Sequence, residues 1–206
     1  MSPYTPGVYG RQEDVGKMGK KNEILVVAPE VPARDRSSGE LRLFTILKIL
    51  SEKYHIVFLA LNARGADEDA KYKKDLEETG IEVLVKDFSF KKILARHRFS
   101  AAFIEFYFTA EHCLNNIRIL QPQCPIIIDS VDIHFYREKL KYGITQDRND
   151  LRKSEETEKK ELAAYQKADL VIAVTQEDAD AVKAKDPTIV FDVIPNIHPI
   201  MESSHE

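Results

Sequence analysis

The sequence predicts an α/β fold: a Rossmann-like, doubly wound, mostly parallel sheet of about seven strands, with helices on both faces. Short apolar runs, typical of strands buried on both faces, recur along the chain. Between these runs, apolar residues recur at helical spacing. Alternation of this kind is typical of βαβ units, which place successive strands parallel in one sheet.

The elements follow in a regular order. A first strand begins at Glu23, is continuously apolar over residues 24–28 and ends at Pro29. A helix begins near Ser38, with Ser37 or Ser38 as its N-cap. Strands are then predicted at 55–61, 81–85, 101–106, 126–129, 170–174 and 189–194. Helices are predicted at 67–79, 90–98, up to about 120, 150–167 and 176–185, with a long connection between 129 and 150.

The 206 residues fit one domain with a real hydrophobic core. Residues 1–22 are rich in glycine and polar side chains and are expected to form a flexible tail. Residues 23–197 are expected to form the domain, and 198–206 the start of a linker. A net charge of −4 gives no general reason to expect nucleic acid as a partner.

The chain has two cysteines, Cys113 and Cys124, and neither lies in a CxxC or other metal-ligand spacing. Its apolar runs are far shorter than the roughly 20 residues that span a bilayer. A reduced, cytoplasmic protein is the expectation. The sequence contains no GxGxxG dinucleotide fingerprint and no GxxxxGK[ST] phosphate loop, which argues against the two commonest nucleotide-binding motifs.

In a doubly wound sheet the ligand crevice lies outside the carboxyl ends of the strands. This edge includes the loop from Pro29 to Gly39, the end of the fourth strand at Glu105, and the loop after the fifth strand. Ser38 and Gly39 open the first helix and are candidate phosphate contacts, because backbone N–H groups point outward from a helix N-terminus. The alternative is an ordinary helix cap with a small residue for clearance.

The loop after the fifth strand has the densest group of polar side chains: Asp129, Asp132, His134 and Arg137. Three functional interpretations compete: hydrogen bonding to sugar hydroxyls, an Asp/Asp/His metal site, and general acid–base catalysis by His134. In a fourth, Asp132 caps a following helix and Asp129 pairs with a nearby loop. A metal site is the least favoured, because three ligands from one loop rarely complete a coordination shell.

Several short motifs, in this order and spacing, resemble the N-terminal domain of family-4-type retaining glycosyltransferases of the GT-B fold. They are AP at 28–29, SGELR at 38–42, DSVDIH at 129–134, ADLVIAVT at 168–175 and VIPN at 193–196. The resemblance covers about residues 23–198. It implies an acceptor-binding domain, with the nucleotide-sugar donor held mainly by a second, C-terminal domain. Since the Pro-Asn element of the family leads into that domain, the donor domain is expected to be absent from these 206 residues.

The resemblance also implies roles for individual residues. Gly39 corresponds to the loop glycine near the donor diphosphate, although many family members have a second glycine where this chain has Ser38. His134 corresponds to the histidine that reaches the transferred sugar and is the catalytic candidate. Arg42 and Arg137 are candidate anion partners. Enzymes of this type generally need no bound metal, so neither a metal nor another cofactor is expected.

The implied function is sugar transfer from a nucleotide-sugar to a glycan or lipid-linked acceptor. A non-catalytic Rossmann-like module that binds a regulatory ligand is the alternative, because a fold by itself does not fix a function. The segment from Phe90 to Arg98 adds a possible partner: with Lys86 it carries five basic residues among phenylalanines, a composition suited to peripheral contact with the inner face of the membrane. An ordinary helix covering the sheet is the simpler interpretation.

Overall fold

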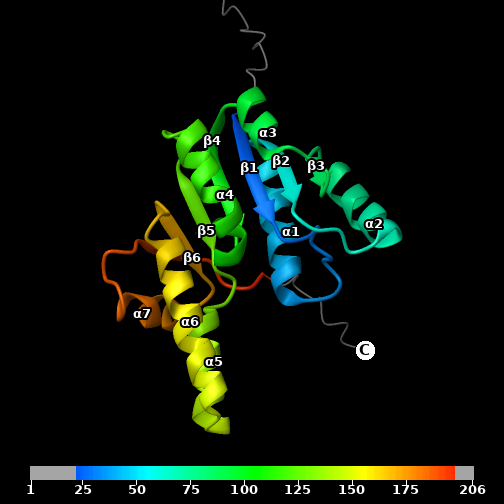
Figure 1. The fold of residues 1–206 in the computed structure, drawn as a ribbon. Coiled ribbons are helices and arrows are strands. Elements are labelled where there is room, and N and C mark those ends of the chain that lie inside the picture. Colours follow the sequence, from blue (N-terminus) through cyan, green and yellow to red (C-terminus); the bar gives the residue numbers. More distant parts are fainter. Residues whose placement is uncertain (1–21, 198–206) are drawn as a thin grey trace, which may run out of the picture.

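The computed structural model describes residues 22–197 and contains one seven-stranded sheet in the order β3-β2-β1-β4-β5-β6-β7 (Figure 1). Every neighbouring pair of strands is parallel. The strands are β1 (Glu23–Ala28), β2 (His55–Ala60), β3 (Glu82–Val85), β4 (Phe99–Glu105), β5 (Ile126–Asp129), β6 (Leu170–Ala173) and β7 (Phe191–Val193). The predicted doubly wound fold is confirmed, and the sheet is wholly rather than mostly parallel.

Seven helices connect these strands within residues 22–197. They are α1 (Ser38–Ser51), α2 (Ala66–Glu77), α3 (Phe90–Arg96), α4 (Tyr107–Leu120), α5 (His134–Thr145), α6 (Arg148–Tyr165) and α7 (Gln176–Lys183). The predicted tail at 1–22, apart from Asn22, and the predicted linker at 198–206 lie outside the described residues.

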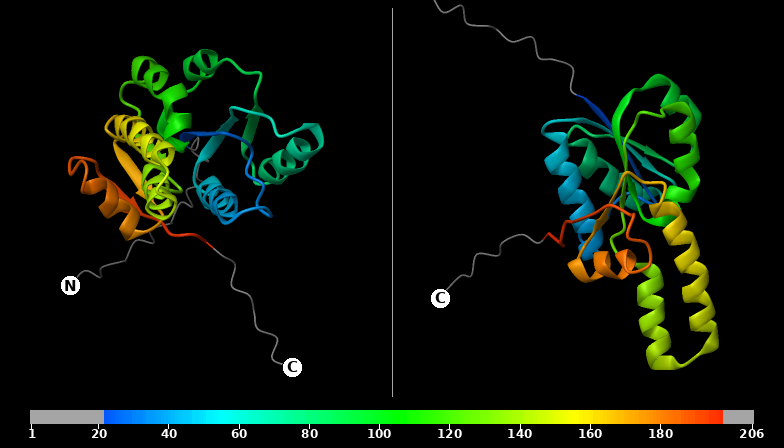
Figure 2. Two further views of the ribbon diagram at one scale, coloured as in Figure 1. Left: turned by 60° about the horizontal axis from the view of Figure 1, so that its bottom comes forward. Right: turned by 90° about the vertical axis from the view of Figure 1, so that its left-hand side faces the viewer.

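The two faces of the sheet bury separate cores. The left view of Figure 2 shows the helices that cover the sheet on its two sides. Along β1, Leu25 and Val27 pack with α3, α4 and α6, whereas Val26 and Ala28 pack with α1 and α2. Alternating side chains of one strand therefore enter opposite cores, which explains why β1 is apolar at every position from 24 to 28.

One helix was not predicted. The long connection expected after β5 contains α5, and α6 begins at Arg148 rather than near residue 150. The two helices form a hairpin that extends beyond the carboxyl edge of the sheet (Figure 2, right). Only Phe135 and Glu138 of α5 are buried, and Leu140 and Ile144 are exposed, so this helix adds little to the core of the domain.

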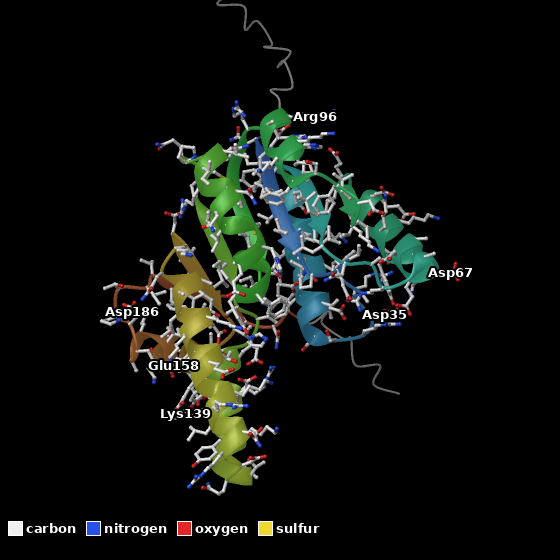
Figure 3. All side chains as sticks on the ribbon, viewed as in Figure 1. Asp35, Asp67, Arg96, Lys139, Glu158 and Asp186 are labelled. Carbon is white, nitrogen blue, oxygen red and sulfur yellow. The ribbon has the colours of Figure 1, made fainter. Side chains whose placement is uncertain are left out.

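The basic helix predicted at 90–98 is the shorter α3. Its apolar residues Ile93 and Leu94 are buried, and Phe88 and Phe90 pack against the same core. Because these apolar side chains pack into the core, few of them are accessible to a membrane. The packing therefore favours the simpler interpretation, a helix that covers the sheet. Figure 3 shows Arg96 at the opposite end of the molecule from Lys139 of α5. Within residues 22–197, no helix has the length and apolar character needed to cross a bilayer.

Candidate functional site

A pocket of about 520 Å³ lies at the carboxyl edge of the sheet. It is centred where β1 and β4 are neighbours, which is the point where the strand order reverses and where α/β sheets bind their ligands. Its lining comes from the ends of four strands and from the loops and helix starts that follow them: Pro29, Glu30, Pro32, Ser37, Gly39 and Glu40 after β1, Arg64 after β2, Glu105 at the end of β4 with Phe106 and Phe108 after it, and Val131, Asp132, His134 and Arg137 after β5.

The pocket brings together most of the residues singled out in the sequence. Those that line it are Gly39, Glu105, Asp132, His134 and Arg137. Those that do not are Ser38, Arg42 and Asp129. Ser37 is the N-cap of α1, with its hydroxyl accepting the N–H of Glu40 at 3.2 Å, so the cap is the first of the two serines considered.

Arg42 and Asp129 form an ion pair beneath the pocket. Their side chains are both 0% exposed, and the distance from Arg42 Nη1 to Asp129 Oδ2 is 2.5 Å. Arg42 Nε also donates to the carbonyl of Ile194 at 3.1 Å. The pair thus connects α1, β5 and the segment after β7. Because protein encloses both side chains, in this conformation they support the pocket from below instead of lining it.

A third buried charge, Glu161 of α6, positions His134. The carboxylate of Glu161 is fully buried and accepts the backbone N–H groups of His134 at 3.2 Å and Phe135 at 3.0 Å. Tyr165 donates its hydroxyl to the same carboxylate at 2.7 Å. A carboxylate at a helix N-terminus satisfies free N–H groups and interacts favourably with the helix dipole. Glu161 therefore fixes the start of α5.

Asp132 does not cap α5, contrary to one interpretation of the sequence. The N-cap is Ile133, which makes no side-chain cap hydrogen bond, and the carboxylate of Asp132 instead accepts from the guanidinium of Arg137. Asp129 likewise pairs with α1 and not with a nearby loop. The distant Glu161 does the capping, and no local spacing in the sequence reveals it.

The ring of His134 is held on several sides. Its Nδ1 lies 3.1 Å from the carbonyl oxygen of Asp132, and because a carbonyl only accepts, this contact assigns the proton to Nδ1. Phe106, Tyr107 and Phe108 contact the ring edge-on, with centroid distances of 5.6, 5.4 and 5.8 Å. In the described part of the chain Nε2 has no hydrogen-bond partner, whereas Nδ1 also lies 3.6 Å from a carboxylate oxygen of the buried Glu161.

Two residues of the pocket have left-handed backbone conformations. Phe106, after β4, has a φ of 66°, and Val131, after β5, has a φ of 57°. This region is costly for a bulky or β-branched side chain, and such strain concentrates at functional sites. A Cβ added to Gly39 would lie 3.1 Å from Val131 Cγ1, so the glycine permits a close approach between the first and fifth loops.

Sequence reasoning missed an ion-pair network on one wall of the pocket. The guanidinium of Arg64 pairs with Glu30 at 3.0 Å and also with Glu40. Glu40 additionally accepts the N–H of Ala33 at 3.3 Å. Only the predicted topology could have indicated Arg64 as a site residue. Arg64 follows β2 and therefore lies at the same edge of the sheet as the loops after β1 and β4.

Glu105 differs from the other carboxyl groups that line the pocket, because Glu30, Glu40 and Asp132 each pair with an arginine. Its residue is 6% exposed, and it lies in register with Asp129 on the neighbouring strand. No side chain among residues 22–197 pairs with or hydrogen-bonds its carboxyl. Burial raises the pKa of Glu105 to about 8, and the negative charges of Asp129 and Glu40 add to the effect. At neutral pH Glu105 therefore holds a proton.

A metal centre has no support in the geometry. Asp129 is paired with Arg42 and Asp132 with Arg137, so the predicted Asp/Asp/His set does not converge on one point. Within the part of the chain that is described, no three His, Cys, Asp or Glu side chains are grouped so that they would hold a metal ion.

Solved structures with a similar fold include glycosyltransferases. Sucrose-phosphate synthase from Thermosynechococcus elongatus has a TM-score of 0.55 and 12% identity, covering 85% of this chain and 48% of its own. A UDP-glucosyltransferase from Polygonum tinctorium has a TM-score of 0.52 and 12% identity, covering 91% and 55%. A Medicago truncatula protein complexed with UDP-glucose has a TM-score of 0.54 and 12% identity, covering 88% and 52%.

The chain therefore spans about half the length of these proteins. By sequence, no family model and no curated protein matches it. At 12% identity the likeness shows the fold alone, a Rossmann-like domain of the kind found in GT-B glycosyltransferases.

The state of Glu105 gives a pH-dependent stability. In the unfolded chain this carboxyl ionises near its ordinary pKa of 4.5, whereas the folded chain keeps the proton up to about pH 8. The folded state thus binds more protons in this interval, and the free energy of unfolding should fall by about 1.4 kcal/mol per pH unit as pH rises through it. Urea denaturation of the wild type and of Glu105→Gln between about pH 5 and pH 8 measures the effect. A stability difference that does not change with pH would show that Glu105 is ionised throughout.

Proposed function

We propose that the chain is the acceptor-binding half of a retaining glycosyltransferase, which transfers a sugar from a nucleotide-sugar to a glycan or lipid-linked acceptor. The observation that carries the proposal is the position of His134, which lines a pocket at the switch point of the sheet and whose Nε2 has no hydrogen-bond partner among residues 22–197; glycosyltransferases share this fold. In this proposal the acceptor binds in the pocket and His134 makes a hydrogen bond to the transferred sugar.

The charge of the pocket supports a division of labour between two domains. Three ionised carboxylates of the lining, Glu30, Glu40 and Asp132, face two guanidinium groups, Arg64 and Arg137, and Glu105 is uncharged at neutral pH. The N-terminus of α1 already holds the carboxylate of Glu40, so it offers little attraction to a second anion. A donor diphosphate is therefore better held by another domain, and the half-length match is consistent with that.

The chemistry assigned to His134 is electrostatic. A neutral ring with its proton on Nδ1 accepts a hydrogen bond at Nε2 from a sugar hydroxyl, and a protonated ring donates one there. Such a bond accelerates transfer only if it strengthens as charge develops in the transition state. The contacts to Asp132 and to the aromatic rings fix the orientation of the imidazole before the substrate binds.

A non-catalytic ligand-binding module is the competing function. A fold likeness limited to half of each glycosyltransferase is also what such a module would give. The two functions differ in whether sugar transfer occurs when a donor domain is supplied.

The chain alone is expected to bind nucleotide-sugar donors only weakly. Calorimetric titration of this 206-residue chain with UDP-, GDP- and ADP-sugars is expected to give dissociation constants no tighter than about 1 mM, equivalent to about −4 kcal/mol of binding free energy. The acidic lining and the occupied α1 N-terminus are the physical reasons. A micromolar dissociation constant for any of these donors would contradict the proposed division between domains.

Replacement of His134 is expected to lower the rate of sugar transfer more than the stability of the protein. In the complete glycosyltransferase, His134→Ala is expected to lower kcat by about 100-fold, the usual effect of removing one hydrogen bond aimed at the transition state. The melting temperature should change little, because the ring is partly exposed in the pocket and lies outside both buried cores. Transfer rate and melting temperature are measured on the same variant.

His112→Ala is the matched control. His112 lies on the exposed side of α4 and does not line the pocket. This variant should keep both its activity and its stability. Near wild-type turnover in His134→Ala, or equal losses in the two variants, would refute the role given to His134.

A further inference from the structure

We propose that the pocket selects a ligand carrying a protonated amine, such as an unacetylated amino sugar, and that the carboxylate of Glu105 binds the ammonium group. The inference rests on the proposed function in one respect: it names the chemical class of the acceptor for the same pocket. The selectivity itself is a binding property and does not require sugar transfer.

One carboxyl group of the pocket has no side-chain partner among residues 22–197. Arg64 pairs with Glu30 and Glu40, and Arg137 pairs with Asp132, so each guanidinium of the lining is already engaged. Glu105 remains, with 6% of its surface exposed and no side-chain partner among the residues that the structure describes. The neighbouring Arg42 makes its hydrogen bonds to Asp129 and to the carbonyl of Ile194, and its positive charge, like that of Arg64, opposes the rise in the pKa of Glu105 without reversing it.

A buried carboxyl without a partner destabilises the folded protein unless a ligand pairs with it. A buried polar group without a hydrogen-bond partner is destabilising, and an ionised one more so. An ammonium group removes both costs at once, because it neutralises the charge and donates up to three hydrogen bonds. A neutral hydroxyl supplies a hydrogen bond only, and a phosphate is repelled by the excess of carboxylates in the lining.

Binding of the amine involves a proton. Below about pH 8 Glu105 is protonated, since burial raises its pKa to about that value. When an ammonium binds, the carboxyl O–H bond breaks, the proton passes to solvent and a carboxylate–ammonium pair forms. The charged and titratable groups around Glu105 come from several elements: Glu40 and Arg42 from α1, Arg64 after β2, Asp129 from β5 and His134 from α5.

This proton balance sets the pH dependence. One proton is released for each ammonium bound, so the affinity should rise about tenfold per pH unit between about pH 6 and pH 7. Between about pH 7 and pH 8 the amine of the sugar begins to lose its own proton and Glu105 begins to ionise without a ligand, so the increase levels off. A ligand without an amine should show no such dependence on Glu105.

The experiment uses the 206-residue chain and three probes of similar size: glucosamine, N-acetylglucosamine and glucose. Calorimetry or protein NMR titration at pH 7 should give a dissociation constant for glucosamine at least tenfold lower than for the other two. Calorimetry in buffers of different ionisation enthalpy should record the release of about one proton with glucosamine and none with glucose. The proton count needs only the wild-type protein, so it tests the proposal even if a variant fails to fold.

Two variants locate the selectivity. Glu105→Gln keeps the shape of the side chain and should reduce the preference for glucosamine over glucose to less than about twofold, with the affinity for glucose unchanged. Glu30→Gln is the matched control, because it removes a carboxylate of the same pocket that Arg64 already pairs. It should keep most of the preference.

Each opposite result overturns the inference. Equal affinity for glucosamine and glucose would exclude amine selectivity, and absence of proton release would exclude ionisation of Glu105. If Glu30→Gln and Glu105→Gln lowered the preference for glucosamine equally, the preference would come from the overall charge of the pocket and not from Glu105. Amine selectivity without any sugar transfer in the complete protein would refute the proposed enzymatic function but leave this inference intact.

Discussion

The carboxyl edge of the sheet depends on one buried ion pair, between Arg42 and Asp129. Two fully buried charges are tolerated only because each neutralises the other, and removal of one would leave the other uncompensated. The pair fixes α1, which carries Gly39 in its first turn, against β5, whose loop leads to His134. The contact of Arg42 with Ile194 fixes the segment after β7 to the same point. The spacing of the pocket loops follows from this arrangement.

The same pair determines the chemistry available above it. Arg42 pairs with Asp129 and not with Glu105 in the neighbouring strand. Its positive charge lowers the pKa of Glu105, but burial and the negative charge of Asp129 raise it by more. Around these groups, the strained backbone at Phe106 and Val131 turns the chain sharply where the strands end. Within residues 22–197, neither the carboxyl of Glu105 nor Nε2 of His134 has a hydrogen-bond partner, so both are available to a ligand in the pocket.

The sheet was predictable from the sequence because buried parallel strands need apolar residues on both faces, and runs such as 24–28 show this directly. The edge that holds the pocket was predictable for a topological reason. Tertiary partnerships were not. Helix α5 starts where Glu161 of α6 accepts its N–H groups, and Arg42, predicted as a partner for a bound anion, pairs with Asp129 of the chain itself. Contacts between residues far apart in the sequence produce no local pattern from which they could be predicted.

A double-mutant cycle on Arg42 and Asp129 tests the central claim most directly. The free energy of unfolding is measured by urea denaturation for the wild type, Arg42→Met, Asp129→Leu and the double variant. Each single change should cost about 3 kcal/mol or more, because it leaves a buried charge uncompensated. The double variant should cost less than the sum of the two by about 2 kcal/mol or more. Additive costs, within about 0.5 kcal/mol, would show that the two residues do not act as a pair and would contradict the account of the pocket built on them.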